Sequence, residues 1–414
     1  MDIYSAVYPL NCILRVLGLT PFNVVGVSGS RRLQDSKILT SYDLSIIMCL
    51  AILALLKLTL FMEYTDHSFF INVRAIEYAA IIVTNIILRL ACLLKKSKYE
   101  SFYKTLNKID KNFQNINRTY SKVFWRLIYV LLITFVLLSF YYIGRCQLHL
   151  ANNRSGLFPS IVGCLVTVTS GTTYLVLIID FTSSVCIINQ RFKALRVIIN
   201  NLVLLEMPIV TSEMHLLNAR IVSLSSIKRK LQIILKVHGL LCDSSSFLTA
   251  AFSVQLLFIF GVSFLTVTYN SYFCVLSLFN QSKGVFSGTE WNLIAFYWLM
   301  LTFLSNMALL SACNTTTHEA KQIAAVVHKL FNKVMDPDVR DELEVFSLQL
   351  LHRKVHFTAC GIFPLDFTLL YSIFGAVTTY LVILIQFQLS IEHDNKVSDA
   401  TGPSLRVSMT PDPI

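Results

Sequence analysis

Residues Thr379–Phe387 read Thr-Tyr-Leu-Val-Ile-Leu-Ile-Gln-Phe. They belong to an apolar run long enough to cross a bilayer, which predicts a membrane-spanning helix. The two polar side chains, Thr379 and Gln386, are seven residues apart, so they share one helix face with Val382 and Gly375. An amide in hydrocarbon is costly unless it meets a partner or water. This face therefore predicts either a pore lining or a helix–helix hydrogen bond.

The composition indicates a polytopic membrane protein. Of the 414 residues, 55% are hydrophobic and 14% are charged, whereas a soluble chain carries about 25% charged residues. The net charge of +11 would suit a nucleic-acid partner, but the positive residues lie between apolar runs. Orientation in a membrane explains them better, so no nucleic acid is expected as a partner.

Seven apolar runs are each long enough to span a bilayer, which predicts an all-α membrane protein with seven transmembrane helices. The predicted spans are Tyr42–Met62, Ile76–Leu94, Leu127–Tyr142, Phe158–Ile179, Phe247–Phe279, Trp291–Ala312 and Phe367–Phe387.

Most of the 35 lysines and arginines lie in residues 1–40, 95–126, 190–245 and 313–366. Because positive residues stay in the cytosol, this bias predicts an inverted topology, with a cytosolic N-terminus and an extracellular C-terminus. A G-protein-coupled receptor has the reverse orientation. In the predicted topology the sequons at Asn153 and Asn280 are glycosylation candidates. Cys146 and Cys274 lie near the outer face, where they either form a disulfide or act as small apolar residues.

The outer halves of the predicted spans 3 to 6 are rich in aromatic and hydroxyl side chains. An apolar cleft with a few polar groups suits a small-molecule ligand, while the alternative is the aromatic belt of any membrane protein. The candidate pocket residues are Tyr141, Tyr142, Thr169, Thr268, Tyr269, Tyr272, Trp291, Tyr297 and Trp298.

No catalytic or nucleotide-binding motif is present, so neither an enzyme nor a cofactor is expected. His352 and His356 are four residues apart but lack a third ligand at useful spacing, so no metal site is expected. Arg89, inside the second span, is expected to extend toward the headgroups. Asp180 lies where the fourth span ends and is expected to mark that boundary rather than to bind a ligand.

The C-terminal fifth of the chain resembles the insect gustatory receptors. The stretch Thr379–Phe387 fits their pattern of Thr379-Tyr380, five apolar residues, then Gln386-Phe387. Further similar segments come before it and near the N-terminus: Val339–Glu342, Ser347–Leu351, His352–Lys354, Phe357–Phe363, Asp366 and Arg15–Phe22. Within the family, the chain looks closest to the non-sugar branch, which is linked to bitter compounds and ribonucleosides.

The resemblance implies a tastant-gated, non-selective cation channel in the plasma membrane of sensory neurons, including dendrite, axon and cell body. Family members are tetramers. The resemblance therefore implies that this chain forms a tetramer with itself or with other gustatory receptors, surrounded by membrane lipids. Helix 7 is split into a cytosolic and a pore-lining part. The pore and gate positions would be Gly375, Thr379, Val382, Gln386 and Phe387.

This scheme divides the chain into regions with different roles. They are a cytosolic N-terminal segment over 1–41, helices 1 to 6 over 42–312 with a cytosolic extension over 190–245, a cytosolic anchor over 313–366, the pore helix over 367–388 and an extracellular tail over 389–414. A receptor coupled to G proteins and a transporter are the alternatives. The ligand, the ion selectivity and the choice between homomer and heteromer stay open.

Overall fold

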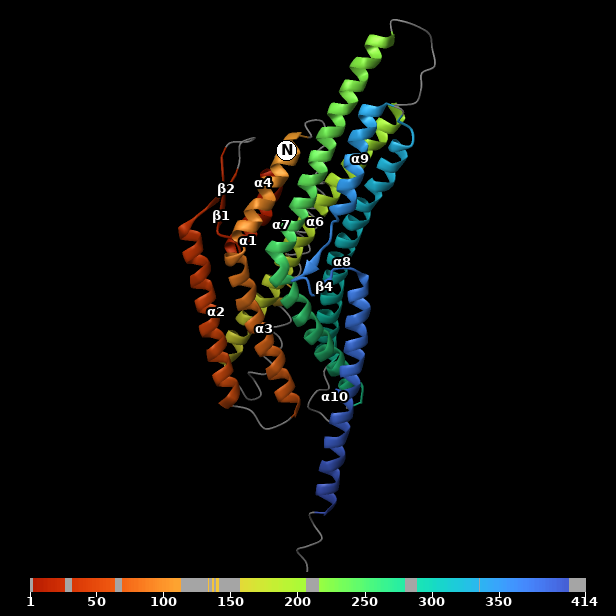
Figure 1. Cartoon of the computed structure of the whole chain (residues 1–414). Coiled ribbons are helices and arrows are strands. Elements are labelled where there is room, and N and C mark those ends of the chain that lie inside the picture. Colours follow the sequence, from red (N-terminus) through yellow and green to blue (C-terminus); the bar gives the residue numbers. More distant parts are fainter. Residues whose placement is uncertain are drawn as a thin grey trace, which may run out of the picture. The chain divides into compact units, whose positions relative to one another are not determined.

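A computed structural model describes residues 3–26, 32–63, 69–112, 133, 136, 137, 139, 140, 157–205, 216–279, 289–334 and 336–401. Nearly all of these residues are helical, which confirms the all-α prediction (Figure 1). The long helices are α2 (Lys37–Glu63), α3 (Phe69–Leu94), α6 (Leu157–Leu205), α7 (Leu216–Phe279), α8 (Thr289–Phe331) and α10 (Phe367–Thr401). Each overlaps one predicted span, whereas the predicted third span, Leu127–Tyr142, lies largely outside the described residues.

Four helices in the described part of the chain are long and apolar enough to cross a membrane. Their apolar segments are Leu165–Leu202, Ile227–Val275, Ala295–Phe331 and Phe367–Ser390. A shorter apolar helical segment, Ala79–Leu94, belongs to α3. The helix α7 has 64 residues, and at 1.5 Å per residue it is about 95 Å long. Since the hydrocarbon core is about 30 Å thick, most of α7 must extend beyond it.

The described residues divide into two units. The first comprises Met1–Val262 and Phe303–Leu369, and the second comprises Ser263–Thr302 and Leu370–Ile414. The helices α7 and α8 contribute residues to both.

The first unit begins with α1 (Ile3–Val16), which a glycine ends in a Schellman motif. Gly18 has φ of +65°, and the backbone N–H of Leu19 donates to the carbonyl of Leu14 at 2.8 Å. The chain then forms an antiparallel hairpin of β1 (Phe22–Val25) and β2 (Arg32–Asp35), in which Phe22 pairs with Asp35. This motif places the carbonyl groups at the end of α1 among the neighbouring helices.

Helices α2, α3 and α6 contact one another in the first unit. The short helix α4 (Lys96–Asn112) continues the chain after α3, and its Asp110 forms a buried ion pair with Arg191 of α6. The pair is bidentate, with N–O distances of 3.0 and 3.1 Å. A fork-to-fork pair of this kind fixes orientation as well as distance.

The polar ends of α6, α7 and α8 run alongside one another, with α9 (Pro337–His352) next to them (Figure 1). Asp336 caps α9 by accepting a hydrogen bond from the Val339 N–H at 3.1 Å. Gln349 of α9 donates to the Leu235 carbonyl of α7 at 3.1 Å. Arg353 follows α9 and pairs with Asp243 of α7 at 2.9 Å. These contacts attach α9 to the lower-numbered half of α7.

A two-residue-per-strand hairpin connects α9 to α10. It pairs β3 (Thr358–Ala359) with β4 (Phe363–Pro364). The turn between them contains Cys360 and Gly361, with φ of +51° and +72°. Two consecutive left-handed residues reverse the chain tightly, so that it enters α10 directly after the hairpin.

Candidate functional site

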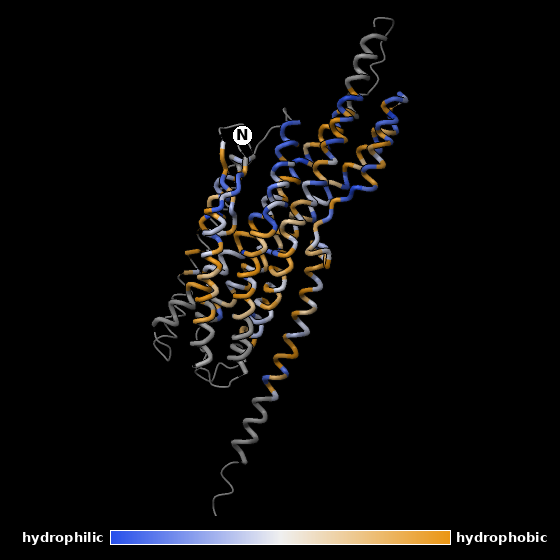
Figure 2. Tube along the Cα trace, turned by 60° about the vertical axis from the view of Figure 1, so that its left-hand side comes forward, coloured by the Kyte–Doolittle hydropathy of each residue, from blue (hydrophilic) through white to orange (hydrophobic). Residues whose placement is uncertain are grey.

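The last helix, α10, carries the predicted pore positions. Asp366 precedes it and accepts a hydrogen bond from the backbone N–H of Thr368 at 2.9 Å, which satisfies one free donor at the start of the helix. Figure 2 shows hydrophobic residues along most of the described length of α10. Even so, only 6% of its most apolar segment is buried within this chain. An apolar helix with so little cover must face lipid or another subunit.

One face of α10 packs inside the second unit. Val377 is 6% exposed. The ring of Tyr380 meets that of Phe264 of α7 edge-on, at a centroid distance of 5.6 Å. Gln388 accepts a hydrogen bond from the Tyr272 hydroxyl of α7 at 3.3 Å. These contacts define the packed face of α10, formed by Val377, Tyr380 and Gln388.

The opposite face of α10 carries the predicted pore residues. Successive helix residues are about 100° apart, so Thr379 lies roughly half a turn from Val377, and Gln386 roughly half a turn from Gln388. Gly375, Thr379, Val382 and Gln386 are all exposed. Phe387, the predicted gate residue, is also exposed, but it lies about 100° around the helix from Gln386, on the flank that carries Tyr380. We call Gly375, Thr379, Val382 and Gln386 the exposed polar face.

The Thr379 hydroxyl has a partner within its own helix. It donates to the Gly375 carbonyl at 3.0 Å, and Thr378 makes the equivalent bond to Phe374 at 2.9 Å. A side chain that bonds to the preceding turn needs no neighbouring helix to satisfy its donor. The hydroxyl oxygen keeps its capacity to accept a further hydrogen bond. A lone amphipathic threonine of this kind is compatible with either lipid or water outside the helix.

The candidate pocket residues are distributed over both units. Thr268, Tyr269, Tyr272, Tyr297 and Trp298 belong to the second unit, and Thr169 belongs to the first. Trp291 lies in α8, but its side chain is outside the described set, as are Tyr141 and Tyr142. Cys146, Asn153 and Asn280 also lie outside the described residues. The alternatives for Cys146 and Cys274, a disulfide or two small apolar side chains, therefore stay open, and the glycosylation candidates stay predictions.

Two of these pocket candidates are buried. Tyr272 is 0% exposed and reaches α10 through Gln388. The Thr268 hydroxyl donates to the Phe264 carbonyl of its own helix at 2.8 Å. Tyr297 and Trp298 are half-buried, and their rings meet edge-on at 5.8 Å. The second unit thus holds a set of aromatic and hydroxyl side chains on α7 and α8, and Tyr272 of this set touches α10.

A buried arginine network was not anticipated from the sequence. The expectation that Arg89 extends to the headgroups is wrong, because the residue is 2% exposed. Its guanidinium donates to Asn85 at 2.9 Å and to the Thr173 hydroxyl of α6 at 2.7 Å. It also donates to the Leu17 carbonyl at the end of α1.

The geometry explains why Arg89 stays inside. Carbonyls at a helix C-terminus lack partners within the helix and carry partial negative charge. The turn at Gly18 places two such carbonyl groups, those of Leu17 and Gly18, next to Arg89. The Gly18 carbonyl oxygen lies 3.4 Å from Arg89 Nη1. Asp43 of α2 is 0% exposed and lies close enough to attract this charge. The network therefore connects α1, α2, α3 and α6. Its members are far apart in the chain, so no short sequence motif predicts it.

The long apolar helices of the described residues indicate the class of protein to which this chain belongs. The fold is a bundle of long apolar helices with polar extensions and a sparsely covered final helix, as in a multi-pass membrane protein. Residues 7–391 match the model of the 7tm chemosensory receptor family. The chain therefore belongs to the 7tm chemosensory receptor family.

Relatives of known name are gustatory receptors of Drosophila melanogaster. The chain is 37% identical to gustatory receptor 28a over 169 residues, which cover 40% of this chain and 37% of that receptor. It is 28% identical over 203 residues to the gustatory receptor for bitter taste 66a, covering 47% and 38% of the two chains. The aligned part thus spans less than two-fifths of these relatives. Another match, at 30% identity over 34% of this chain and 32% of the relative, is the gustatory receptor for sugar taste 43a. The names do not favour the bitter branch over the sugar branch.

A solved structure shares the fold. The insect olfactory receptor OR5 of Machilis hrabei covers 93% of this chain and 98% of its own, with a TM-score of 0.62 and 13% identity. A second structure of that receptor, in complex with eugenol, matches equally well. At this identity the likeness concerns the fold alone. Together with the family assignment, it favours a chemosensory receptor over a G-protein-coupled one.

Proposed function

We propose that this protein is a subunit of a tastant-gated, non-selective cation channel in the plasma membrane of sensory neurons. In this proposal the N-terminus is cytosolic, the C-terminus is extracellular and α10 lines a central pore. The first part of helix 7 is α9 and the second is α10. The proposal rests on the family assignment for its class and on α10 for its mechanism.

The observation that carries the proposal is the two-sided character of α10. Its packed face, Val377, Tyr380 and Gln388, is occupied by contacts inside the second unit. Its exposed polar face holds an amide, a hydroxyl and a glycine with no atom within 4 Å of an added Cβ. In lipid that amide would be unfavourable. Beside a hydrated ion it is favourable, which supports a pore lining.

A single α10 cannot enclose a pore. One such helix from each of several subunits can, and a tetramer, with itself or with other gustatory receptors, fits the proposal. Uncharged Gln386 amides would then accompany a hydrated cation. Phe387, next to Gln386 and 57% exposed, would supply the apolar side chain that closes the path by excluding water.

The link from ligand to pore is the contact between α7 and α10. A small-molecule ligand bound among Thr268, Tyr269, Tyr297 and Trp298 would contact α7, the helix that carries Tyr272, and α8. Tyr272 in turn contacts Gln388 on the packed face. A ligand opens the channel only if it binds the open arrangement more tightly than the closed one. The hydrogen bond between α7 and α10 gives that preference a route to α10.

The test is an electrical recording on the full chain, co-expressed with a gustatory partner subunit where the chain alone is silent. Gln386→Ala should shift the reversal potential under mixed cations or change the basal current, because it removes a pore-lining amide. Surface expression, measured by labelling of intact cells, should be unchanged, since Gln386 is exposed in the subunit.

Gln388→Ala is the matched control, because it removes the same amide two residues away on the packed face. Its reversal potential should equal that of the unmodified channel. Equal selectivity in all three channels would remove Gln386 from the conduction path. A shift in the Gln388 variant alone would mean that α10 faces the pore with its other side.

A further inference from the structure

The junction between α3 and α4 carries three lysines directly after an apolar helix. The apolar segment Ala79–Leu94 ends α3, and Lys95, Lys96 and Lys98 follow it. Helical hydrogen bonds continue through the junction, because the Lys95 N–H donates to a carbonyl of α3 at 3.0 Å and the Tyr99 N–H donates to the Lys95 carbonyl at 3.3 Å. The angular positions of side chains around α3 therefore carry over into the first turn of α4.

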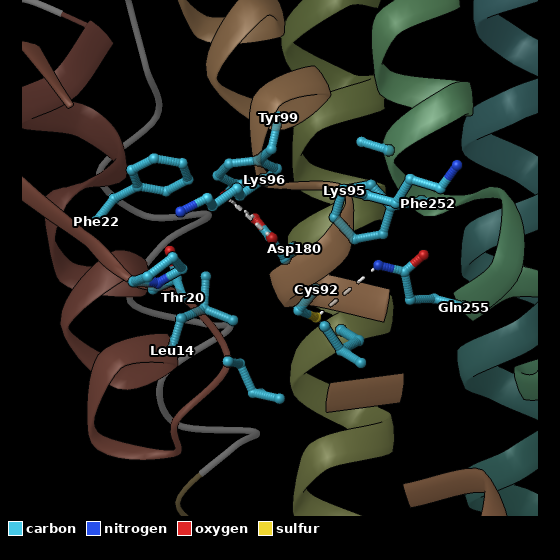
Figure 3. A pocket seen from close by; sticks show the side chains of 14 residues that line it. Leu14, Thr20, Phe22, Cys92, Lys95, Lys96, Tyr99, Asp180, Phe252 and Gln255 are labelled. Carbon is cyan, nitrogen blue, oxygen red and sulfur yellow. Dashed lines mark hydrogen bonds between the residues drawn. The ribbon is translucent and has the colours of Figure 1, made fainter. Parts of the chain in front are cut away.

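Two of these lysines point toward α7. The Lys98 ammonium lies over the ring of Phe247 of α7, 5.8 Å from the ring centroid. In Figure 3 the Lys95 side chain extends to the side of Phe252, which also belongs to α7, whereas Lys96 extends to the opposite side. Lys95 and Lys98 are three residues apart, so they are neighbours on the helix surface. The junction thus presents two ammonium groups on one side.

The third lysine already has its counter-ion, whereas these two do not. Lys96 pairs with Asp35 at an Nζ–Oδ2 distance of 2.5 Å. Among the described residues, neither Lys95 nor Lys98 forms a salt bridge. The two acidic residues of α4 are each paired with another basic side chain. Lys95 and Lys98 are therefore available to an anion from outside the chain.

An acidic residue inside the chain is the rival for Lys95. Asp180 lines the same small cavity as Lys95. Its two oxygens accept hydrogen bonds from the Tyr99 hydroxyl at 3.2 and 3.1 Å. No salt bridge joins Asp180 to Lys95 in the part of the chain that the structure describes. Asp180 thus has a neutral partner, and the Lys95 charge is left without one.

An exposed apolar stripe on α3 leads to Lys98. Val83, Leu90 and Leu94 are 53%, 38% and 80% exposed, and we call them the apolar stripe. At 100° per residue, all three lie within about 80° of Lys98 around the helix axis, while Lys96 lies about 160° away. In a bilayer such a stripe faces acyl chains, and a lysine at its end extends to the headgroups.

We propose that the apolar stripe, Lys95 and Lys98 bind one anionic phospholipid, with an acyl chain along the stripe and the phosphate at the two ammonium groups. Basic residues directly after a membrane-spanning helix attract anionic headgroups. Each ammonium has three donors, which suit the free oxygens of a phosphate diester. Phosphatidylcholine has the same phosphate beside a cation of its own, so it binds the two lysines less well.

The experiment measures the melting midpoint of the purified full chain in lipid nanodiscs at one ionic strength. Discs of phosphatidylcholine are compared with discs that contain an increasing fraction of phosphatidylglycerol, whose net charge comes from its phosphate. A ligand that binds the folded state raises the midpoint with its concentration. We expect a rise that saturates with phosphatidylglycerol, and no rise when inorganic phosphate is added to discs of phosphatidylcholine.

The double variant Lys95→Met, Lys98→Met removes both charges at the site. Each lysine near a bilayer surface contributes about 1 kcal/mol, and 1.4 kcal/mol is a factor of ten, so the response should weaken about thirtyfold. Half-saturation then needs a fraction of phosphatidylglycerol that a disc cannot reach. The double variant Lys95→Arg, Lys98→Arg keeps both charges and should keep the response.

The matched control is Lys108→Met, Lys111→Met, which removes the same charge from exposed positions of the same helix. Lys108 follows Leu94 by 14 residues, which is about 21 Å of helix. This distance exceeds twice the Debye length of about 8 Å at physiological salt, so the control should keep the response. Where the Lys95 and Lys98 double variant does not fold, Lys98→Met alone replaces it, because Lys98 is exposed. The single variant should weaken the response about fivefold.

Three outcomes would overturn the proposal. Equal losses in the Lys95, Lys98 variant and in the Lys108, Lys111 variant would mean that the response follows the overall charge of α4. A rise with inorganic phosphate as large as that with phosphatidylglycerol would mean that the lysines bind a free anion without the apolar stripe. A Lys95, Lys98 variant that melts earlier in every disc but keeps its response would mean that Lys95 neutralises Asp180.

These measurements are independent of the proposed channel function. The readout involves neither ion conduction nor a tastant. Both leaflets of a disc contain the anionic lipid, so the result does not depend on which way the chain crosses the membrane either.

Discussion

The helices α6 and α10 are both apolar enough to span a membrane, yet their surroundings differ. In the most apolar segment of α6, 72% of the residues are buried inside the chain, against 6% in α10. Polar groups in α6, such as Thr173, meet partners on neighbouring helices. Gln386 of α10 points away from the packed face of its helix. Hydropathy thus predicts that a helix crosses the membrane, but it does not predict whether another helix, lipid or water lies beside each of its faces. Those surroundings decide the role of a polar side chain on the helix.

The largest expected effect comes from removing the charge at the centre of the α1–α2–α3–α6 network. Arg89→Met leaves Asp43, Asn85 and the end of α1 without their cation in a buried site. Breaking a buried charged network typically costs about 3–5 kcal/mol. We expect a large fall in the melting midpoint and in the yield of folded protein from size-exclusion chromatography.

Lys104→Met serves as the control, because the Lys104 side chain is 63% exposed and pairs only across one helical turn with Glu100. Its midpoint should barely move, since such surface pairs contribute little. An Arg89→Met protein that is as stable as the Lys104 variant would show that the network is not needed for folding.

A medium effect should separate the two faces of α10. Val377→Asn places an amide on the packed face, at a position that is 6% exposed. If the amide finds no partner there, the cost is about 1–3 kcal/mol. Val382→Asn makes the same change where the side chain is 48% exposed, so stability should change by less than about 0.5 kcal/mol.

The measurement is the melting midpoint of each variant, followed by its current in cells. Val377→Asn should melt earlier, whereas Val382→Asn should keep its midpoint and change its conductance or basal current. The reverse order of midpoints would show that the packed and exposed faces of α10 are assigned the wrong way round.

The long helices were predicted well from the sequence because each of them has a recognisable apolar run of its own. An apolar run of about twenty residues needs no information about distant residues. The motif at Thr379 and Gln386 was visible for the same reason, since both lie on one helix and its period is known. Asp366 and Gly18 entered the sequence analysis only as parts of segments similar to the gustatory receptors. The fold shows that Asp366 caps the start of α10 and that Gly18 ends α1.

Long-range partners escaped prediction. Arg89 looked like a residue close enough to a span end to reach the headgroups, but its partners come from residues 17, 85 and 173. Asp180 looked like a boundary marker, yet it lines a cavity with Thr20 and Gln255. In each case the decisive contact joins segments whose pairing leaves no local pattern.

The smallest expected effect concerns the hydrogen bond between the pocket candidate Tyr272 and Gln388 of α10. Tyr272→Phe keeps the buried ring and removes the hydroxyl that donates to Gln388 at 3.3 Å. The loss should be about 0.5–1.5 kcal/mol in stability. A double-mutant cycle with Gln388→Met, read by melting, isolates the pair because it subtracts the separate effects of the two changes. If the coupling is measurable and tastant potency shifts with it, the contact between α7 and α10 transmits the ligand signal. A coupling energy of zero would mean that this hydrogen bond does not transmit the signal. Apolar packing between α7 and α10, such as the ring of Phe264 against that of Tyr380, would then be the route.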